Sequence, residues 1–353
     1  MKAVVKYGYG KYETELRHIS IPEISDDDVL IEVKAAAVCG SDIAFDNGEH
    51  ANILNPPVVL GHEFSGVVAK TGKNVTAWKV GDRVVSDNTG TACGTCYACG
   101  TADYLSCPDR LGIGYGMDGG FTKYVKILGK TLAVFPNSLM KIPDSMTFEE
   151  AAILDPACNA YMAVVQEAKL IPGEYMAVFG VGALGQFCIQ AARAAGAAKI
   201  IAIGLSGDGA RFDMAKKNGA TDIVMSDQVN CIEEVMRLTN GEGVALVADC
   251  AGVAVVLNQA IEIVRPAGTI VKIGYDHNPY NCSLDPIIDK AISIKGHFGY
   301  TWLSWRNVMN LVQAGKWDLK GMISHTMKIS EFRKAFDMVR SKESIKIILY
   351  PED

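Results

Sequence analysis

The chain has 353 residues, of which 49% are hydrophobic and 21% are charged, and it carries a net charge of −6 at pH 7. This length suits two domains better than one, and the composition is that of a globular protein with a sizeable core. An acidic balance argues against nucleic acid or an anionic membrane surface as a partner. Because no apolar stretch has the features of a signal peptide or the length of a membrane span, we expect a cytoplasmic protein.

Up to about residue 150 the pattern is that of short strands separated by Gly, Pro and Asn turns, as in residues 29–38 and 81–85. This pattern predicts an antiparallel, barrel-like domain. Pro156 and Pro172 flank a predicted helix over residues 160–167.

After residue 170 the pattern changes to an alternation of strands and helices. Strands are predicted at 175–179, 200–203, 244–248 and 269–273, and helices at 186–195 and 211–218. Such alternation is typical of βαβ units in a parallel, doubly wound sheet with helices on both faces. The tail from Ser293 is predicted to contain one strand and two amphipathic helices and to rejoin the first domain. The expected domains are therefore 1–155 plus 294–353, and 156–293.

The turn after the first strand of the second domain reads Gly180-Val-Gly182-Ala183-Leu184-Gly185 and fits the pattern G-x-G-x-x-G. The first glycine allows a tight turn, the second lets the backbone approach a pyrophosphate, and the third lets helix and strand pack closely. The helix N-terminus adds N–H donors for the phosphates. Since the motif lies between a predicted strand and a predicted helix, we expect residues 180–185 to bind a dinucleotide, with Ile273 at the end of a later strand.

The position that usually selects between NAD and NADP does not hold the usual acidic residue. An Asp or Glu is expected about twenty residues after the glycine motif, where it binds the ribose 2′-hydroxyl. This chain has Gly204-Leu205-Ser206 there. A glycine leaves space for a 2′-phosphate, which Ser206 and Arg211 are near enough to contact. Alternatively, Arg211 is a solvated helix residue and Asp208 is the helix cap, so both cofactors stay open.

Two groups of residues have the character of metal ligands. Cys93, Cys96, Cys99 and Cys107 lie on one short loop, where four thiolates are able to enclose a structural Zn²⁺ tetrahedrally. An iron–sulfur cluster or free thiols are the alternatives, and the clustering argues against disulfides.

The second group is dispersed along the chain and combines a thiolate, an imidazole and carboxylates. Such a mixture suits zinc, and three protein ligands with an open position are typical of a catalytic site. Taken singly, each residue has an ordinary alternative, such as a buried apolar Cys or a structural ion pair at Glu63. The candidates are Cys39, His62, Glu63 and Asp155.

Together these motifs resemble the zinc-dependent medium-chain dehydrogenase/reductase superfamily over essentially the whole chain. The matching segments are 39–42, 61–66, 80–84, the four-cysteine loop, 119–121 and the motif at Gly180. Segment 39–42 resembles the sorbitol and polyol dehydrogenases, whereas segment 155–160 resembles the L-threonine dehydrogenases. The resemblance implies a GroES-like catalytic domain, a Rossmann-type domain, a cleft between them and a homodimer or homotetramer.

The resemblance also implies roles for individual residues. Cys39, His62 and Glu63 would hold the catalytic zinc, Asp155 would be a further ligand or hold its water, and Ser41 would accept the substrate's proton. Many relatives carry a His five residues after the zinc cysteine, where this chain has Ala44. The proton must therefore leave through water, Ser41 or a carboxylate such as Asp46.

These observations predict an enzyme with two zinc ions per chain that moves a hydride between a small-molecule secondary alcohol and NAD or NADP. We expect a polyol or sugar derivative, because two carboxylate ligands would favour a chelating substrate and because the segment after Cys39 is polar. L-threonine is the alternative substrate. A zinc-ribbon nucleic-acid module, a zinc-free reductase and a catalytically inactive nucleotide-binding relative are the rival classes.

Overall fold

The computed structural model describes residues 1–276 and 278–352, which form two compact units. The first comprises Met1–Asp155, Thr301–Trp305 and Leu319–Asp353, and the second comprises Pro156–Tyr300 and Arg306–Asp318. The sequence assigned everything after residue 293 to the first domain. In the structure, this segment is instead divided between the two units.

The first unit is built on two largely antiparallel sheets, of which the smaller has the order β2-β1-β4. The larger has the order β15-β16-β3-β5-β6-β8, with β7 also paired to β3. Only β15 and β16 run parallel to each other. The strands are β1 (Lys2–Lys6), β2 (Thr14–His18), β3 (Val29–Ala37), β4 (Val58–Val59), β5 (Glu63–Thr71), β6 (Arg83–Ser86), β7 (Tyr124–Ile127), β8 (Leu139–Lys141), β15 (Ile323–Lys328) and β16 (Lys346–Tyr350).

Short helices connect these strands, and their ends follow local sequence signals. Thr147 caps α4 because its hydroxyl accepts the Glu150 N–H, while Glu150 in turn accepts the Thr147 N–H. Phe64, Phe121 and Phe336 lie in the core of this unit. Its helices are α1 (Gly40–Asp46), α2 (Tyr97–Gly100), α3 (Gly129–Val134), α4 (Phe148–Ala152) and α12 (Phe332–Arg340), and two further helices, α5 (Leu154–Tyr161) and α11 (Trp302–Gln313), are shared with the second unit.

The second unit contains one six-stranded sheet in which every pairing is parallel, as predicted. Its order, β11-β10-β9-β12-β13-β14, is that of a doubly wound dinucleotide-binding sheet. The chain leaves the central strand first in one direction and then in the other, so right-handed crossovers place helices on opposite faces. The strands are β9 (Tyr175–Phe179), β10 (Lys199–Gly204), β11 (Asp222–Met225), β12 (Val244–Asp249), β13 (Val264–Lys272) and β14 (Ser293–Gly296).

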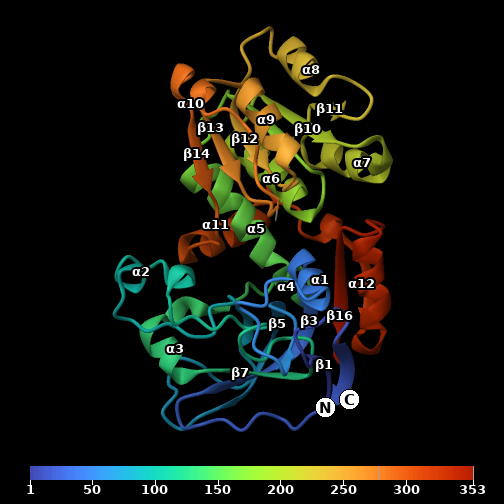
Figure 1. Cartoon of the computed structure of the whole chain (residues 1–353). Coiled ribbons are helices and arrows are strands. Elements are labelled where there is room, and N and C mark those ends of the chain that lie inside the picture. The colour runs from blue at the N-terminus through green and yellow to red at the C-terminus, as the bar shows by residue number, and fades with distance from the viewer. Residues whose placement is uncertain (277, 353) are drawn as a thin grey trace. The chain divides into compact units, whose positions relative to one another are not determined.

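Helices pack around this sheet, as Figure 1 shows for the green to orange part of the chain. Helix α6 contacts α7, and α8 contacts α9. The helices are a π-helix over Met162–Glu167, α6 (Ala183–Ala195), α7 (Gly209–Asn218), α8 (Cys231–Leu238), α9 (Ala254–Ile263) and α10 (Asp285–Asp289). The predicted fold class, a GroES-like unit plus a Rossmann-type unit, is therefore confirmed.

Two predicted elements differ from the structure. The helix expected from residue 160 begins at Leu154, so Pro156 lies inside its first turn, where a missing N–H costs nothing. The tail after residue 293 contains three strands rather than one, because β15 and β16 join the first unit while β14 completes the parallel sheet.

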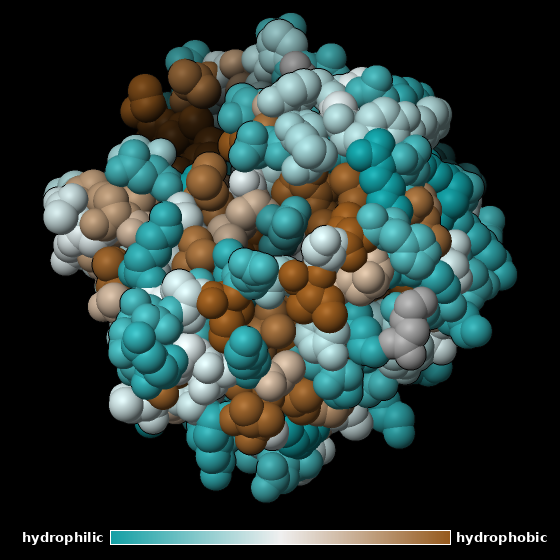
Figure 2. All heavy atoms as spheres, turned by 90° about the horizontal axis from the view of Figure 1, so that it is seen from below, coloured by the Kyte–Doolittle hydropathy of each residue, from teal (hydrophilic) through white to brown (hydrophobic). Residues whose placement is uncertain are grey.

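The molecular surface mixes polar and apolar side chains. Figure 2 shows brown apolar groups interspersed with teal hydrophilic groups over one face. Scattered apolar exposure of this kind is normal for globular proteins. Within the described residues, no helix is long and apolar enough to cross a bilayer.

Candidate functional site

The four-cysteine loop brings its sulfur atoms together. The Sγ atoms of Cys93, Cys96, Cys99 and Cys107 all lie within 4.8 Å of one another. The Cys93 and Cys99 sulfurs are 3.9 Å apart, close to the edge of about 3.8 Å expected of a tetrahedron with Zn–S bonds of about 2.3 Å. The donor set therefore fits a closed zinc site.

Backbone amides of the same loop favour ionised sulfur. The N–H groups of Thr95 and Cys96 donate to Cys93 Sγ at 3.4 and 3.3 Å, and they lower the pKa of that thiol to about 6. Burial, in contrast, raises the pKa of Cys99 to about 12. Four thiolates in one place require a cation, since metal ligation and thiol deprotonation are coupled.

The second metal-ligand group forms where two antiparallel strands end side by side. Cys39 follows β3, Glu63 opens β5, and Ala37 pairs with Glu63 in the ladder. Atoms of Cys39, His62 and Glu63 lie within 4.8 Å of one another. Gly61 directly precedes His62 and has a φ of +93°. A Cβ at this position would lie 2.5 Å from the Phe121 ring, so only glycine fits.

The two nitrogens of His62 have different neighbours. Nε2 lies 3.2 Å from the Ser41 hydroxyl, and Nδ1 lies 3.5 Å from Asp42 Oδ1. Asp42 is fully buried, and its other oxygen accepts the Cys39 N–H at 2.9 Å. A carboxylate behind the imidazole is the usual arrangement around a metal-bound histidine, because it fixes the tautomer and the ring orientation. No sequence pattern predicted this role for Asp42.

Glu63 is paired with a lysine that is distant in sequence. Lys346 Nζ lies 2.5 Å from Glu63 Oε2 and also donates to the Val38 carbonyl at 2.9 Å. Burial raises the pKa of Glu63 to about 8 despite the charge of Lys346. Glu63 Oε1, in addition, is buried without a hydrogen-bond partner among the described residues. One oxygen thus belongs to a structural ion pair, while the other is suited to a cation.

The fourth predicted ligand, Asp155, has different neighbours from the other three. Asp155 is outside the group formed by Cys39, His62 and Glu63. Its carboxylate accepts from Asn88 Nδ2 at 3.2 Å. Burial, with a smaller contribution from the charge of Asp155, raises the pKa of Asp87 to about 7. A role for Asp155 as a further ligand, or as the residue that holds the zinc-bound water, stays a prediction.

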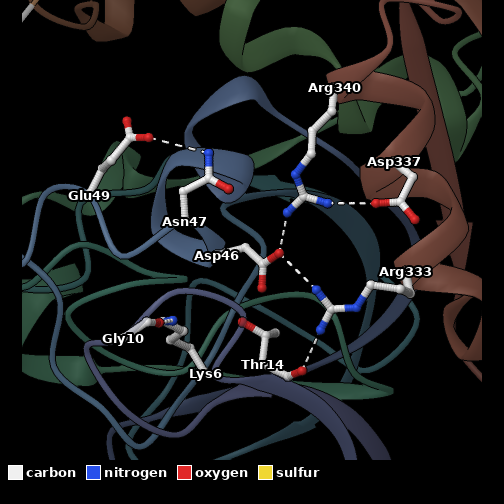
Figure 3. Close-up of polar contacts among 9 residues, drawn as sticks. All are labelled: Lys6, Gly10, Thr14, Asp46, Asn47, Glu49, Arg333, Asp337 and Arg340. Atoms are coloured by element: carbon white, nitrogen blue, oxygen red, sulfur yellow. Dashed lines mark hydrogen bonds and ion pairs between the residues drawn. The ribbon is translucent and has the colours of Figure 1, made fainter.

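Asp46, considered above as a proton acceptor, has a structural environment instead. It is fully buried and forms ion pairs with Arg333, at 2.8 Å, and with Arg340, both from α12 (Figure 3). Arg333 also donates to the Thr14 carbonyl. The neighbouring Asn47 amide donates to Glu49, so the polar segment after Cys39 is largely bonded within the protein.

The glycine turn of the second unit has the geometry that the motif predicts. Gly180 has a φ of +88°. A Cβ on Gly185 would lie 1.8 Å from the Gly180 carbonyl oxygen, so α6 approaches the turn too closely for any side chain. Around Gly182, by contrast, the space within 4 Å is open. Ala183 and Leu184 form the first turn of α6, whose N–H groups are available to an anion.

The other predicted cofactor residues lie at the carboxyl ends of the parallel strands, as the glycine turn does. Gly204 ends β10, with Ser206 and Arg211 in the following turn and helix, and Ile273 follows β13. In a doubly wound sheet, a dinucleotide usually binds at the carboxyl ends of the strands, at the point where the strand order reverses.

Comparison with known proteins identifies the family. The family model for the alcohol dehydrogenase GroES-like domain matches residues 25–137, and that for zinc-binding dehydrogenase matches 183–314. The zinc-type alcohol dehydrogenase-like protein YdjL of Escherichia coli K12 is 38% identical over 99% of this chain and 98% of its own length. The chain belongs to the zinc-dependent medium-chain dehydrogenase superfamily.

Members with different named substrates are about equally similar to it. The sorbitol dehydrogenase of Halalkalibacterium halodurans is 33% identical over the whole of both chains, and the L-threonine 3-dehydrogenase of Bacillus velezensis is 33% identical over 99% of each. A zinc-binding dehydrogenase structure from Sinorhizobium meliloti, bound to NADP, is 27% identical with a TM-score of 0.89 over 99% of both chains. This medium-chain dehydrogenase is therefore an NAD(P)-dependent zinc alcohol or polyol dehydrogenase.

Proposed function

We propose that this dehydrogenase transfers a hydride between a secondary carbinol of a polyol or sugar derivative and the nicotinamide of NAD(P). The observation that carries the proposal is the convergence of Cys39, His62 and Glu63 beside the Ser41 hydroxyl. Lewis-acid polarisation of the substrate oxygen is the chemistry that a zinc ion supplies in such a site. The four-cysteine loop would hold a second, structural zinc.

The chain's own residues would handle the proton and the orientation of the site. Ser41 would accept the proton of the substrate hydroxyl, because its oxygen lies 3.2 Å from His62 Nε2, the nitrogen that would bind the zinc. Asp42 would keep the other nitrogen of His62 turned away from the reacting atoms. Ala44 has no titratable group and Asp46 is held by two arginines, so the proton would leave Ser41 through water.

Residue 44 and the named relatives bear on the choice between a polyol and L-threonine as substrate. The chelation argument depends on Asp155 as a second carboxylate near the zinc, which stays a prediction. Ala44 supports a polyol, because threonine-active members of the resembled family carry a histidine at that position. The similarity to sorbitol dehydrogenase supports it as well. L-threonine is the second candidate, supported by an equally similar L-threonine 3-dehydrogenase and by segment 155–160.

A substrate screen tests this function. Purified enzyme is assayed by nicotinamide absorbance with sorbitol, xylitol, galactitol, their phosphates, sugar lactones and L-threonine, each with both cofactors. Ser41→Ala serves as the matched variant and should lose activity on every substrate without losing NAD(P) binding. Turnover of threonine well above every polyol would overturn the substrate, and turnover of none would overturn the reaction class.

We also infer a homodimer or homotetramer in the cytoplasm. Strand β14 ends the described sheet with all four of its residues exposed, beside the exposed Ile288 and Phe298. Such an edge is a template for pairing with a second copy across a two-fold axis. None of the ten cysteines, all of which the structure describes, is in a disulfide, and this is consistent with a reducing compartment. Sedimentation of Ile294→Lys against the unmodified chain tests the interface, since a monomer is expected only for the variant.

A further inference from the structure

The loop after β10 bears on the choice between NAD and NADP. In doubly wound sheets this loop holds the ribose of the adenosine half, usually through an acidic residue at the end of the strand. Gly204 occupies that position, and its lack of a side chain suggested space for a 2′-phosphate. The structure fills that space: a Cβ on Gly204 would lie 3.0 Å from Asp208 Oδ2 and 3.0 Å from the Phe212 ring. A carboxylate therefore lies where the side chain of an acidic residue 204 would begin.

Asp208 is held firmly in this position. Its Oδ2 accepts the Leu205 N–H at 3.0 Å, and its Oδ1 lies 3.6 Å from the Arg211 guanidinium. The side chains of Asp208 and Arg211 are only 13% and 16% exposed. Arg211, which the sequence suggested as a phosphate ligand, thus already has its charge balanced by Asp208.

Ser206, the other suggested phosphate ligand, faces a second carboxylate. Its N–H and its hydroxyl both donate to Asp227, at 2.8 and 2.5 Å. These hydrogen bonds lower the pKa of Asp227, which therefore stays ionised. The loop consequently presents two carboxylates against one guanidinium, and its serine hydroxyl already donates to one of those carboxylates.

We infer that Asp208 replaces the missing acid at position 204 and accepts a hydrogen bond from the ribose hydroxyl, and that the excess of carboxylate over guanidinium charge in this loop disfavours a 2′-phosphate, so that the chain prefers NAD. The inference rests on the proposed function, because it assumes that the glycine turn binds the cofactor. It differs from the usual arrangement in that the acid comes from the turn that precedes α7 rather than from the end of β10.

The test is calorimetric titration of the full chain with NAD and, separately, with NADP. The unmodified chain should bind NAD about tenfold more tightly than NADP, or better. Asp208→Asn keeps an acceptor for the Leu205 N–H but removes the charge, so it should improve NADP binding and reduce this ratio about tenfold. Asp213→Asn, an exposed residue of the same helix, is the matched control and should leave the ratio unchanged.

The outcomes separate this inference from the proposed function. Equal or tighter binding of NADP by the unmodified chain would overturn the inference alone, as would an Asp208→Asn ratio within twofold of the original. Binding of neither cofactor would overturn the proposed function and the inference with it. Melting temperature shows whether each variant is folded, and Asp227→Asn provides a second variant that should shift the ratio in the same direction.

Discussion

At the scale of single residues, the ligand histidine depends on a buried carboxylate. Asp42 faces His62 Nδ1 at 3.5 Å and accepts the backbone N–H of Cys39 at 2.9 Å. Asp42→Asn retains an acceptor for the Cys39 N–H but loses the charge behind the imidazole. Zinc affinity at this site should fall about 10- to 100-fold, measured by competition with a chelator. Asp144→Asn, at a fully exposed carboxylate, should leave the affinity unchanged.

The buried ion pair of Lys346 and Glu63 contributes to stability. Both side chains are at most 2% exposed, so removing the Lys346 charge leaves Glu63 Oε2 buried without its ion-pair partner. Lys346→Met should therefore lower the free energy of unfolding by about 3 to 5 kcal/mol, measured by urea titration. Lys346→Arg keeps the charge and should lose less. An unchanged stability for the methionine variant would show that Glu63 is balanced by another cation.

At the scale of elements, Asp46 joins the helix after the zinc cysteine to the C-terminal helix. Its ion pairs attach α1 to α12, far apart in sequence (Figure 3). Asp46→Ala should reduce the free energy of unfolding by about 3 kcal/mol, near the lower limit for a broken buried pair because both arginines keep partial contact with water. Asp337→Asn removes an exposed partner of Arg340 and should cost less than about 1 kcal/mol. A loss of turnover in Asp46→Asn without a loss of stability would show that Asp46 takes part in proton transfer.

The same elements show what local sequence was able to predict. The glycine turn at 180–185 and the cysteine loop at 93–107 are contiguous, so their spacing carried the information needed. Lys346, Arg333 and Arg340 meet Glu63 and Asp46 across more than 280 positions. No local pattern marks such partners, since a basic residue on a C-terminal strand or helix reads as a solvated charge. A bond from Asp155 to zinc stays a prediction, because a match to a family segment does not by itself place a carboxylate among the ligands.

At the scale of the whole molecule, two ligand groups that share no residue predict two zinc ions per chain. Both groups have their donor atoms within 4.8 Å of one another, but their environments differ. The four-sulfur group is closed, so its zinc should contribute chiefly to folding, whereas the group at Cys39 has three ligands and an open position. Loss of one ion should therefore have different consequences from loss of the other.

Metal analysis of paired variants tests this division. The unmodified chain should contain close to two zinc ions, and Cys39→Ser and Cys93→Ser should each contain one. Cys93→Ser should show the larger drop in melting temperature, because a closed zinc site contributes its binding free energy to folding. Cys39→Ser should stay folded and lose turnover, because the ligand that anchors the reacting site is gone. Iron in place of zinc, or one ion in the unmodified chain, would contradict the assignment, and equal melting temperatures would contradict the division of roles.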